Sequence, residues 1–334
     1  MRAFDSAYAT IRRQAVLVVI LSCCFVPAVY AQQSVPGEGL PGTKCSLAPS
    51  ERGPGANPTE CTLPTVAALA NAGDPYEQNQ LGVASALVLG PGSTISDARK
   101  WFEKSAQQGY VPAQVNLGVL YASGWGTPQN YGAALYWLKA AANQSSPRAE
   151  TNLGILYLKG LGVKQDYAEA RRYFRAAAEA GDAGAMVNLG FMSDRGLGIP
   201  VDRAAAAEWY RKAAEQGDPL GQNNLADLYL RGEGLPQRDD LALVWFQKAA
   251  ANGNTAARIK LGYMYATGRA TKRDAESAYA WLLAASLTGD QRGLEYLPRL
   301  EAQLSPGQLE RAKQRAKELL ATPRISIAEV TFVQ

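Results

Sequence analysis

Most of the chain after residue 65 repeats with a period of 36 residues. An aromatic residue recurs at this interval in six copies, and so does a leucine that is followed by glycine in five of them. The aromatic positions are Trp101, Trp137, Tyr173, Trp209, Trp245 and Trp281, and the leucine positions are Leu81, Leu117, Leu153, Leu189, Leu225 and Leu261. Six copies without insertion or deletion predict a stack of one supersecondary unit, because a unit of this size cannot bury its apolar face alone.

Each repeat divides into two helices separated by a glycine-rich loop. In the second copy, Leu117 and Tyr121 lie four residues apart and therefore on one face of a helix. Gly124 follows and supplies the left-handed conformation that often ends a helix. Ala134 and Trp137, three residues apart, share a face of the next helix. We therefore predict a helix-turn-helix repeat.

Small residues and capping residues recur in the same register as the core. Gly118 is expected to let a neighbouring helix approach closely, and the aromatic residues are expected to supply the apolar area that joins the repeats, with Trp209 buried. Seven residues before each aromatic stands a capping residue, except at Arg238, where we expect the adjacent Asp239 to take over. The capping residues are Thr94, Asn130, Asp166, Asp202 and Asp274.

The two ends of the repeat array are modified. Residues 65–72 resemble the back half of a second helix, and near the other end Leu297 keeps the leucine register although Pro298 replaces the glycine. Ser305 to Gln308 form a capping box, and an apolar face follows it. That face consists of Leu309, Ala312, Ala316 and Leu319. We predict an all-α protein, a right-handed α-solenoid of about six 36-residue repeats over 65–290, with an N-terminal half-repeat, capping helices over 291–321 and a tail over 322–334.

The first 31 residues have the pattern of a secretory signal peptide. Arg12 and Arg13 precede an apolar run, and small residues lead to a predicted cleavage site after Ala31. The run is short and contains Pro27, so the mature protein is expected to have no membrane span and to be periplasmic or secreted. Lipoprotein anchoring at Cys23 and a retained membrane anchor are the alternatives.

Residues 32–64 are rich in Pro, Gly and Ser and predict an extended arm. The arm contains Cys45 and Cys61, the only cysteines left after cleavage of the signal. In an oxidising compartment such a pair is expected to form a disulfide. The arm also holds a GxGxxG pattern from Gly37, but no apolar strand precedes it, so we do not interpret it as a dinucleotide site.

The chain contains no histidine, which excludes the Ser-His, Cys-His and His-metal arrangements of most hydrolases and metalloenzymes. Its formal charge of +4 is small for 334 residues and gives no reason to expect a nucleic-acid partner. We therefore expect a protein that is not an enzyme and that has no cofactor or metal.

The third copy carries the fullest form of a family pattern. Its residues are Ala149, Leu153, Gly154, Tyr157, Gly160, Gly162, Asp166, Ala170, Tyr173, Phe174, Ala177, Ala178 and Gly181. This pattern resembles the Sel1-like repeat, a relative of the tetratricopeptide repeat, and the resemblance covers about residues 70–290. Ser145 and Ala270 depart from it at glycine positions, which leaves the shapes of those loops open.

The resemblance implies an adaptor or scaffold. We interpret the chain as a non-enzymatic exported scaffold that binds envelope proteins or peptides through the concave surface of the solenoid, with a regulatory or assembly role. The alternative, which one branch of the family suggests, is a cell-wall-associated hydrolase or a binder of muropeptide or β-lactam-type ligands. That branch has a disulfide in each repeat, whereas the repeats here have no cysteine.

Two features are candidates for binding a partner. A polar ladder stands one residue before the repeated leucines, at Asn116, Asn152, Asn188, Asn224 and Lys260. It either lines a peptide groove or satisfies backbone groups of the adjoining repeat. Trp125 has no aromatic counterpart in the other copies, so it is either an exposed anchor or a residue packed on its own loop.

Overall fold

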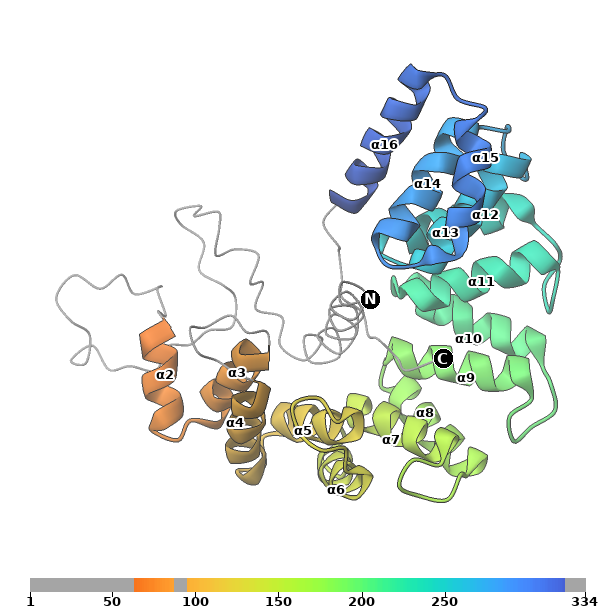
Figure 1. Ribbon diagram of the computed structural model, residues 1–334. Helices are drawn as coiled ribbons and strands as arrows, with labels where there is room; N and C mark the ends of the chain where they lie inside the picture. Colours follow the sequence, from red (N-terminus) through yellow and green to blue (C-terminus); the bar gives the residue numbers. More distant parts are fainter. Residues whose placement is uncertain (1–62, 87–94, 322–334) are drawn as a thin grey trace. The chain divides into compact units, whose positions relative to one another are not determined.

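A computed structural model describes residues 63–86 and 95–321, and this part of the chain is all-α (Figure 1). The predicted signal peptide, most of the arm with Cys45 and Cys61, and the tail lie outside the described residues. The helices are α2 (Leu63–Asn71), α3 (Pro75–Ala86), α4 (Ile95–Gln107), α5 (Val111–Ser123), α6 (Tyr131–Ala142), α7 (Pro147–Lys159), α8 (Tyr167–Glu179), α9 (Ala183–Arg195), α10 (Arg203–Glu215), α11 (Pro219–Arg231), α12 (Asp239–Ala251), α13 (Thr255–Thr267) and α14 (Ala275–Leu287), followed by the 3₁₀-helix η3 (Gln291–Tyr296), α15 (Leu297–Glu301) and α16 (Pro306–Ala321).

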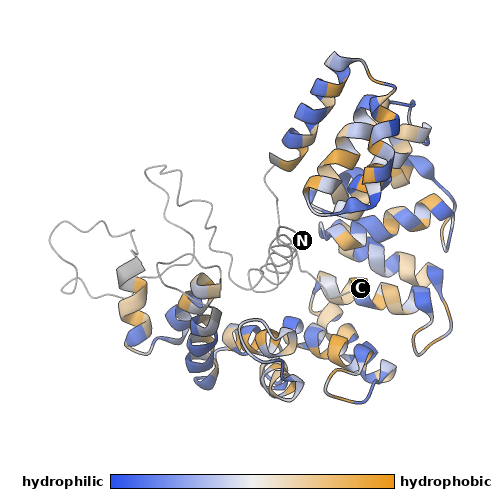
Figure 2. Ribbon diagram, viewed as in Figure 1, coloured by the Kyte–Doolittle hydropathy of each residue, from blue (hydrophilic) through white to orange (hydrophobic). Residues whose placement is uncertain are grey.

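The helices belong to two compact units, which we describe separately. The N-terminal unit ends at Ala149 and the C-terminal unit begins at Glu150, within α7. In each unit a helix packs against the next one along the chain, from α2 to α6 and again from α8 to α14. Figure 2 shows hydrophilic and hydrophobic residues mixed along each helix, as expected for helices that bury only one stripe. The predicted α-solenoid of helix-turn-helix repeats is confirmed.

A close contact that recurs along the array joins the glycine of the first helix to the residue that follows the repeated aromatic, and we call the six repeated aromatic residues the aromatic ladder. A Cβ placed on Gly154 would lie 2.5 Å from the ring of Phe174, and one on Gly118 would lie 2.6 Å from Leu138. Glycine at this register therefore allows the two helices to approach closely, as we predicted for Gly118, and the fifth repeat carries the small Ala226 there. The buried residues of this register are Phe102, Leu138, Phe174, Tyr210, Phe246 and Leu282.

The ladder aromatics themselves are less buried than the sequence led us to expect. Trp209 is partly exposed. Of the six repeated aromatic residues only Trp281 is buried, with an exposed fraction of 9%. The expectation of a buried Trp209 is therefore wrong, because its register lies on the outer edge of the second helix. The neighbouring Tyr210 is buried in its place.

The second helices are capped as predicted by Asn130, Asp166, Asp202 and Asp274, whereas Thr94 lies outside the described residues and α12 is an exception. Asp166 accepts hydrogen bonds from the backbone N–H groups of Ala168 and Glu169, and Gly124 ends α5 with a φ of 68°. At α12 the N-cap Arg238 makes no side-chain capping bond. Asp239 does not take over as expected, because its carboxylate instead accepts two hydrogen bonds from the Arg269 guanidinium.

Two loops keep the glycine geometry without glycine. Ser145 and Ala270 each have a φ of 60°, in the left-handed region that disfavours a side chain. The loops at Ser145 and Ala270 therefore keep the backbone conformation that glycine has at these registers in the other repeats.

A second set of contacts joins successive repeats through amide side chains. Gln144 Nε2 donates to the carbonyl oxygen of Gly109 at 3.3 Å and to Gln114 Oε1 at 3.0 Å. Gln114 Nε2 in turn donates to the carbonyl oxygen of Ala106. The same three bonds recur from Gln108 and from Asn252. These amides give carbonyl groups at helix ends a side-chain donor and join each repeat to the one before it.

The C-terminal elements close the array as predicted. Leu297 is buried, and a short 3₁₀-helix and α15 replace a full first helix. The capping box forms, because the Ser305 N–H donates to Gln308 Oε1 and the Gln308 N–H donates to Ser305 Oγ. Ala312 and Ala316 on α16 are fully buried. In the described residues we find no helix with the length and apolar character of a membrane span.

Candidate protein-interaction surface

The asparagine ladder lies on the first helices, and its members differ in burial. Asn116 and Asn188 are fully buried, whereas Asn152 and Asn224 are partly exposed. Asn188 Nδ2 donates to a carbonyl oxygen of its own helix at 2.8 Å. The ladder therefore does not present one continuous row of free amides, and its partner role stays a prediction.

Asn116 shows how a buried member of the ladder is held. Its Nδ2 donates to Oδ1 of Asn79, in the preceding repeat, at 3.0 Å. Within the described residues its own Oδ1 is buried without a hydrogen-bond partner. The contact joins two first helices by their side chains, and no backbone group of the adjoining repeat takes part in it.

Trp125 lies in the loop after α5 and is partly buried. It packs against the hydrophobic cluster of the N-terminal unit, which includes Phe102 and Leu120. Its backbone N–H also donates to Ser123 Oγ at 3.3 Å. The indole therefore rests on its own unit, and its role as an anchor for a partner stays a prediction.

Lys260, the last member of the ladder, is an ion-pair partner. Its Nζ lies 3.1 Å from Oδ1 of Asp227, whose side chain is 17% exposed. Asp227 stands where the other first helices carry Val83, Val119, Ile155, Phe191 and Tyr263. A carboxylate has therefore replaced an apolar or aromatic side chain at this register, and Lys260 compensates its charge.

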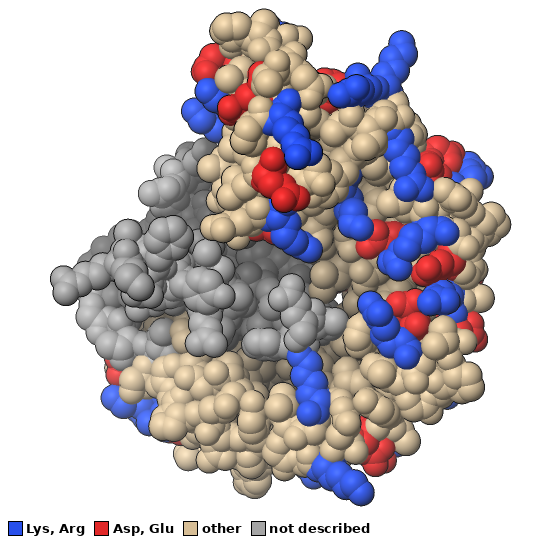
Figure 3. All heavy atoms as spheres, turned by 45° about the vertical axis from the view of Figure 1, so that its right-hand side comes forward, with Lys and Arg blue, Asp and Glu red and all other residues tan. Residues whose placement is uncertain are grey.

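This pair is the end of a chain of charges that runs over the C-terminal unit. Arg231 reaches both Asp227 and Glu233, and Arg203 reaches both Glu233 and Asp194, with nitrogen–oxygen distances between 3.3 and 3.9 Å. We call these groups the charged network: Asp194, Arg203, Asp227, Arg231, Glu233 and Lys260. Figure 3 likewise shows acidic and basic side chains interspersed on the face in view. The network links α9, α10, α11 and α13 by polar groups of both signs.

Tyr210 lies beneath the charged network at the register where the other repeats have Phe or Leu. Burial raises the pKa of its phenol, and the Asp194 carboxylate raises that pKa further, whereas Arg195 and Arg231 lower it. The phenol is therefore neutral at physiological pH. The Tyr210 hydroxyl therefore adds a buried polar group beneath the charged side chains of the surface.

The repeats match one family model throughout. The model described as the Sel1 repeat matches residues 91–110, 111–146, 147–182, 183–218, 219–254 and 255–290. The chain belongs to the Sel1 repeat family. Members of this family typically mediate protein–protein interactions.

Solved structures agree with this assignment. A Sel1 repeat protein from Oxalobacter formigenes is 34% identical over 65% of this chain and 89% of its own, with a TM-score of 0.61. A protective antigen of uropathogenic Escherichia coli that displays an SLR fold is 30% identical over 79% of this chain, also with a TM-score of 0.61. The chain spans 57% of that antigen's length. No curated protein matches the chain significantly.

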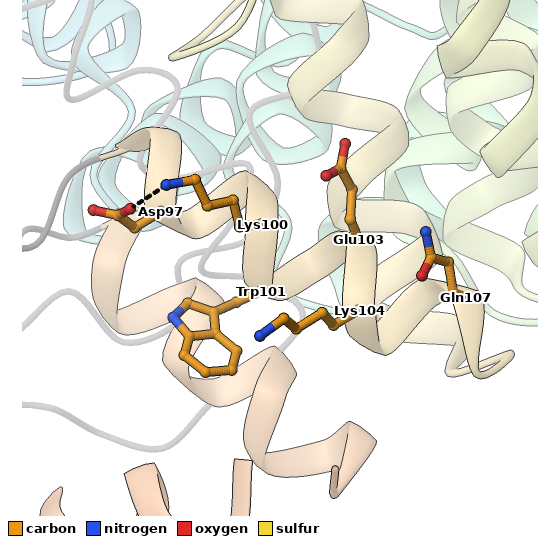
Figure 4. A pocket seen from close by; sticks show the side chains of 6 residues that line it. All are labelled: Asp97, Lys100, Trp101, Glu103, Lys104 and Gln107. Carbon is orange, nitrogen blue, oxygen red and sulfur yellow. Dashed lines mark hydrogen bonds and ion pairs between the residues drawn. The ribbon is translucent and has the colours of Figure 1, made fainter. Parts of the chain in front are cut away.

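This Sel1 repeat protein also has a shallow hollow of about 390 Å³ beside α4 (Figure 4). All six described residues that line it, Asp97, Lys100, Trp101, Glu103, Lys104 and Gln107, lie on this one helix. Lys100 binds Asp97, and the Lys104 ammonium lies 4.5 Å from the centre of the Trp101 ring. The charged groups are thus already paired with their neighbours, so we do not interpret the hollow as a ligand site.

The described part of the Sel1 repeat array shows no grouping of three or more Cys, Asp or Glu side chains that could hold a metal ion. One carboxyl in it has a pKa near neutrality. Burial raises the pKa of Asp218 to about 6, but this side chain is 1% exposed and caps α11. It is closed to a substrate, so its unusual pKa concerns stability and not acid–base catalysis.

Proposed function

We propose that this Sel1 repeat protein is a non-enzymatic scaffold, exported to the cell envelope, that binds a protein or peptide partner on the surface of the charged network. The observation that carries the proposal is the replacement of apolar register positions by acidic residues in α9 and α11, at Asp194 and Asp227, together with the cations that pair with them. Partly exposed ion pairs contribute only about 0–1 kcal/mol each to stability, so folding alone gives little reason for five of them in one chain of contacts. Such pairs can instead exchange partners with the polar and charged groups of a bound peptide, which gives specificity.

We expect the protein to capture less of its partner when charged residues of the network are replaced by the uncharged residues of another repeat. We would replace Asp227 by Val and Lys260 by Asn, the residues that the second repeat carries at these registers. The control removes the exposed pair of Arg238 and Asp240, outside the network. In-envelope crosslinking followed by mass spectrometry should recover the same partner with the wild type and the control, and at least tenfold less with the double variant. Equal recovery with the double variant, or a turnover activity that one substitution abolishes, would contradict the proposal.

Export is a separate part of the proposal and has its own test. N-terminal sequencing of the purified cellular protein should give Gln32 as the first residue, and free-thiol counts should rise by two on reduction if Cys45 and Cys61 are joined. An intact Met1 or a lipid-modified Cys23 would contradict cleavage after Ala31, and an unchanged thiol count would refute the disulfide.

A further inference from the structure

The rings of the aromatic ladder are covered in two different ways. Four of them carry a cation of their own helix: Lys104 over Trp101, Arg172 over Tyr173, Lys212 over Trp209 and Lys248 over Trp245, at 4.1 to 4.5 Å from the ring centre. A cation over a ring keeps the ring partly solvated and adds a favourable electrostatic contact. These four second helices therefore present charged outer faces.

Trp281, in the last repeat, is covered by a helix. α16 packs on α14, and Arg311 binds Glu276 while Arg315 donates to Ser277 Oγ. Leu319 of α16 packs against the hydrophobic cluster that contains Trp281. The outer face of α14 thereby loses its contact with solvent.

The residues of α14 beside Trp281 are adapted to this cover. Ala284 stands at the register of Lys104, Lys212 and Lys248, and Ala280 stands one residue before the ring. Both alanines are fully buried. Small side chains at both positions let α16 approach closely, where a lysine would hold it away.

Trp137 on α6 has neither kind of cover in the described residues. At the register of the covering lysines α6 has Ala140, as α14 does, and no described cation lies over the ring. Tyr136 packs edge-on against Trp137 at 5.0 Å between ring centres, yet 66% of Tyr136 is exposed. The outer face of α6, formed by Gly132, Ala133, Tyr136, Trp137 and Ala140, is uncharged and partly or fully exposed.

We infer that the outer face of α6 is a docking site for an amphipathic helix of a partner protein, with a leucine and alanine face like that of α16 and acidic flanks. The geometry is that of the α14–α16 contact, which the molecule already forms once. The sign of the flanks follows from Lys139, the only charged residue of α6, which is exposed and has no acidic partner among the described residues. At the register of Glu276, which binds α16, α6 has Gly132. A basic helix such as α16 of a second copy would therefore find no counter-charge there.

The test uses the full mature chain and two labelled helical peptides. The first has the sequence of α16 with Arg311, Lys313, Arg315 and Lys317 replaced by Glu, and the second is unaltered α16. Fluorescence anisotropy should show saturable binding of the acidic peptide and at least tenfold weaker binding of the basic one. Lack of saturable binding, or tighter binding of the basic peptide, would overturn the inference.

Two lysine substitutions locate the site. Ala140→Lys places on α6 the residue that α4, α10 and α12 carry at this register, so the variant is expected to fold, and it should weaken binding of the acidic peptide at least tenfold. Ala176→Lys makes the same change on α8, whose ring already lies under Arg172, and should leave binding unchanged. Circular dichroism checks that both variants are folded. Equal effects of the two substitutions would overturn the site on α6, and a wild-type dimer that Ala140→Lys dissociates would show a second copy to be the occupant instead.

Discussion

Arg203 and Asp239 begin successive second helices at the same register and carry opposite charges. Each binds a residue of opposite sign 30 positions later: Arg203 Nε lies 3.3 Å from Glu233 Oε2, and Asp239 accepts two bonds of 2.8 Å from Arg269. The junction between repeats thus keeps its geometry while its charges are reversed. The opposite polarity of the two junctions disfavours pairing out of register. A helix placed one repeat away from its own partner would bring Arg203 to Arg269, or Asp239 to Glu233, and these pairs carry like charges.

Reversing one partner of this junction should destabilise the protein, and reversing both should restore it. We expect Arg269→Glu to lower the free energy of unfolding by about 1 kcal/mol, since the pair is partly exposed and screened. Adding Asp239→Arg recreates the arrangement of Arg203 and Glu233 and should recover most of the loss. Urea denaturation of the four members of the cycle measures the coupling. A coupling free energy of zero would show that the pair does not stabilise the junction.

Ala270→Gly should stabilise the protein by about 1 kcal/mol, because Ala270 has a φ of 60° in the left-handed region. The matched control is Gly234→Ala at the same register of the preceding repeat. A Cβ there would lie 2.3 Å from backbone atoms of Arg203, so this substitution should destabilise by more than Ala270→Gly stabilises. Chemical denaturation gives both values. A destabilising Ala270→Gly would mean that its methyl group makes contacts worth more than the strain.

Asp218→Asn should stabilise the protein above pH 6 and have little effect near pH 4. The pKa of Asp218 is raised from 3.8 to about 6, first by burial and then by the nearby Asp182. The stability from the protonated form is therefore fully present below about pH 4 and is lost as the pH rises through 6. A shift of this size corresponds to roughly 3 kcal/mol at pH 8 as an upper value. The residue at this register in the next repeat, Asn254, already donates to a carbonyl oxygen of the preceding repeat.

The pH dependence is measured as urea midpoints of the wild type and of Asp218→Asn at pH 4 and pH 8. Asp202→Asn is the control, because Asp202 caps α10 in an exposed position and binds the Ala205 N–H as Asp218 binds the Gly221 N–H. Its effect on stability should be much smaller than the gain that Asp218→Asn gives at pH 8. An Asp218→Asn variant with no gain at pH 8 would show that this carboxyl titrates near its ordinary value.

Gly154→Ala should destabilise the protein by about 1–3 kcal/mol through overpacking against Phe174, whose ring would lie 2.5 Å from the new Cβ. Gly132→Ala tests the same substitution where there is room, since its Cβ would meet only Asn130 Oδ1 at 3.4 Å. The control should stabilise by up to about 1 kcal/mol, because alanine is the better helix former. Thermal denaturation separates the two. A neutral Gly154→Ala would show that the helix pair can move apart without loss.

The periodicity of the sequence was sufficient to predict the two helices of each repeat and most of their ends. A single repeat carries its own apolar stripe, its capping residue and its stop, as Leu117, Asn130 and Gly124 show. These features act within one or two turns of chain, so they can be recognised without knowledge of the neighbours. The same holds for the capping box of α16, whose residues are three positions apart.

The candidate surface was harder to predict, because the partners of its groups are distant in sequence. Lys260 appeared as a break in the asparagine ladder, but nothing local indicated that it binds Asp227, 33 residues earlier. The register does contain a usable signal: Asp227 and Asp194 are acidic where other repeats have mainly apolar residues. A charge at an otherwise apolar register is thus the signal that marks these two acidic members of the network.

The sequence by itself determined that this protein is a stack of helix-turn-helix repeats, since every repeat carries the same local instructions. Only the tertiary structure decided which face of each second helix is buried. The periodicity of the aromatic residues led us to expect a buried Trp209, but contact with Gly190 on the neighbouring helix buries Tyr210 instead. Trp281 and Trp137 likewise look equivalent in the sequence, yet one lies under α16 and the other does not. Burial depends on what packs opposite a residue, and that is a property of the assembled chain.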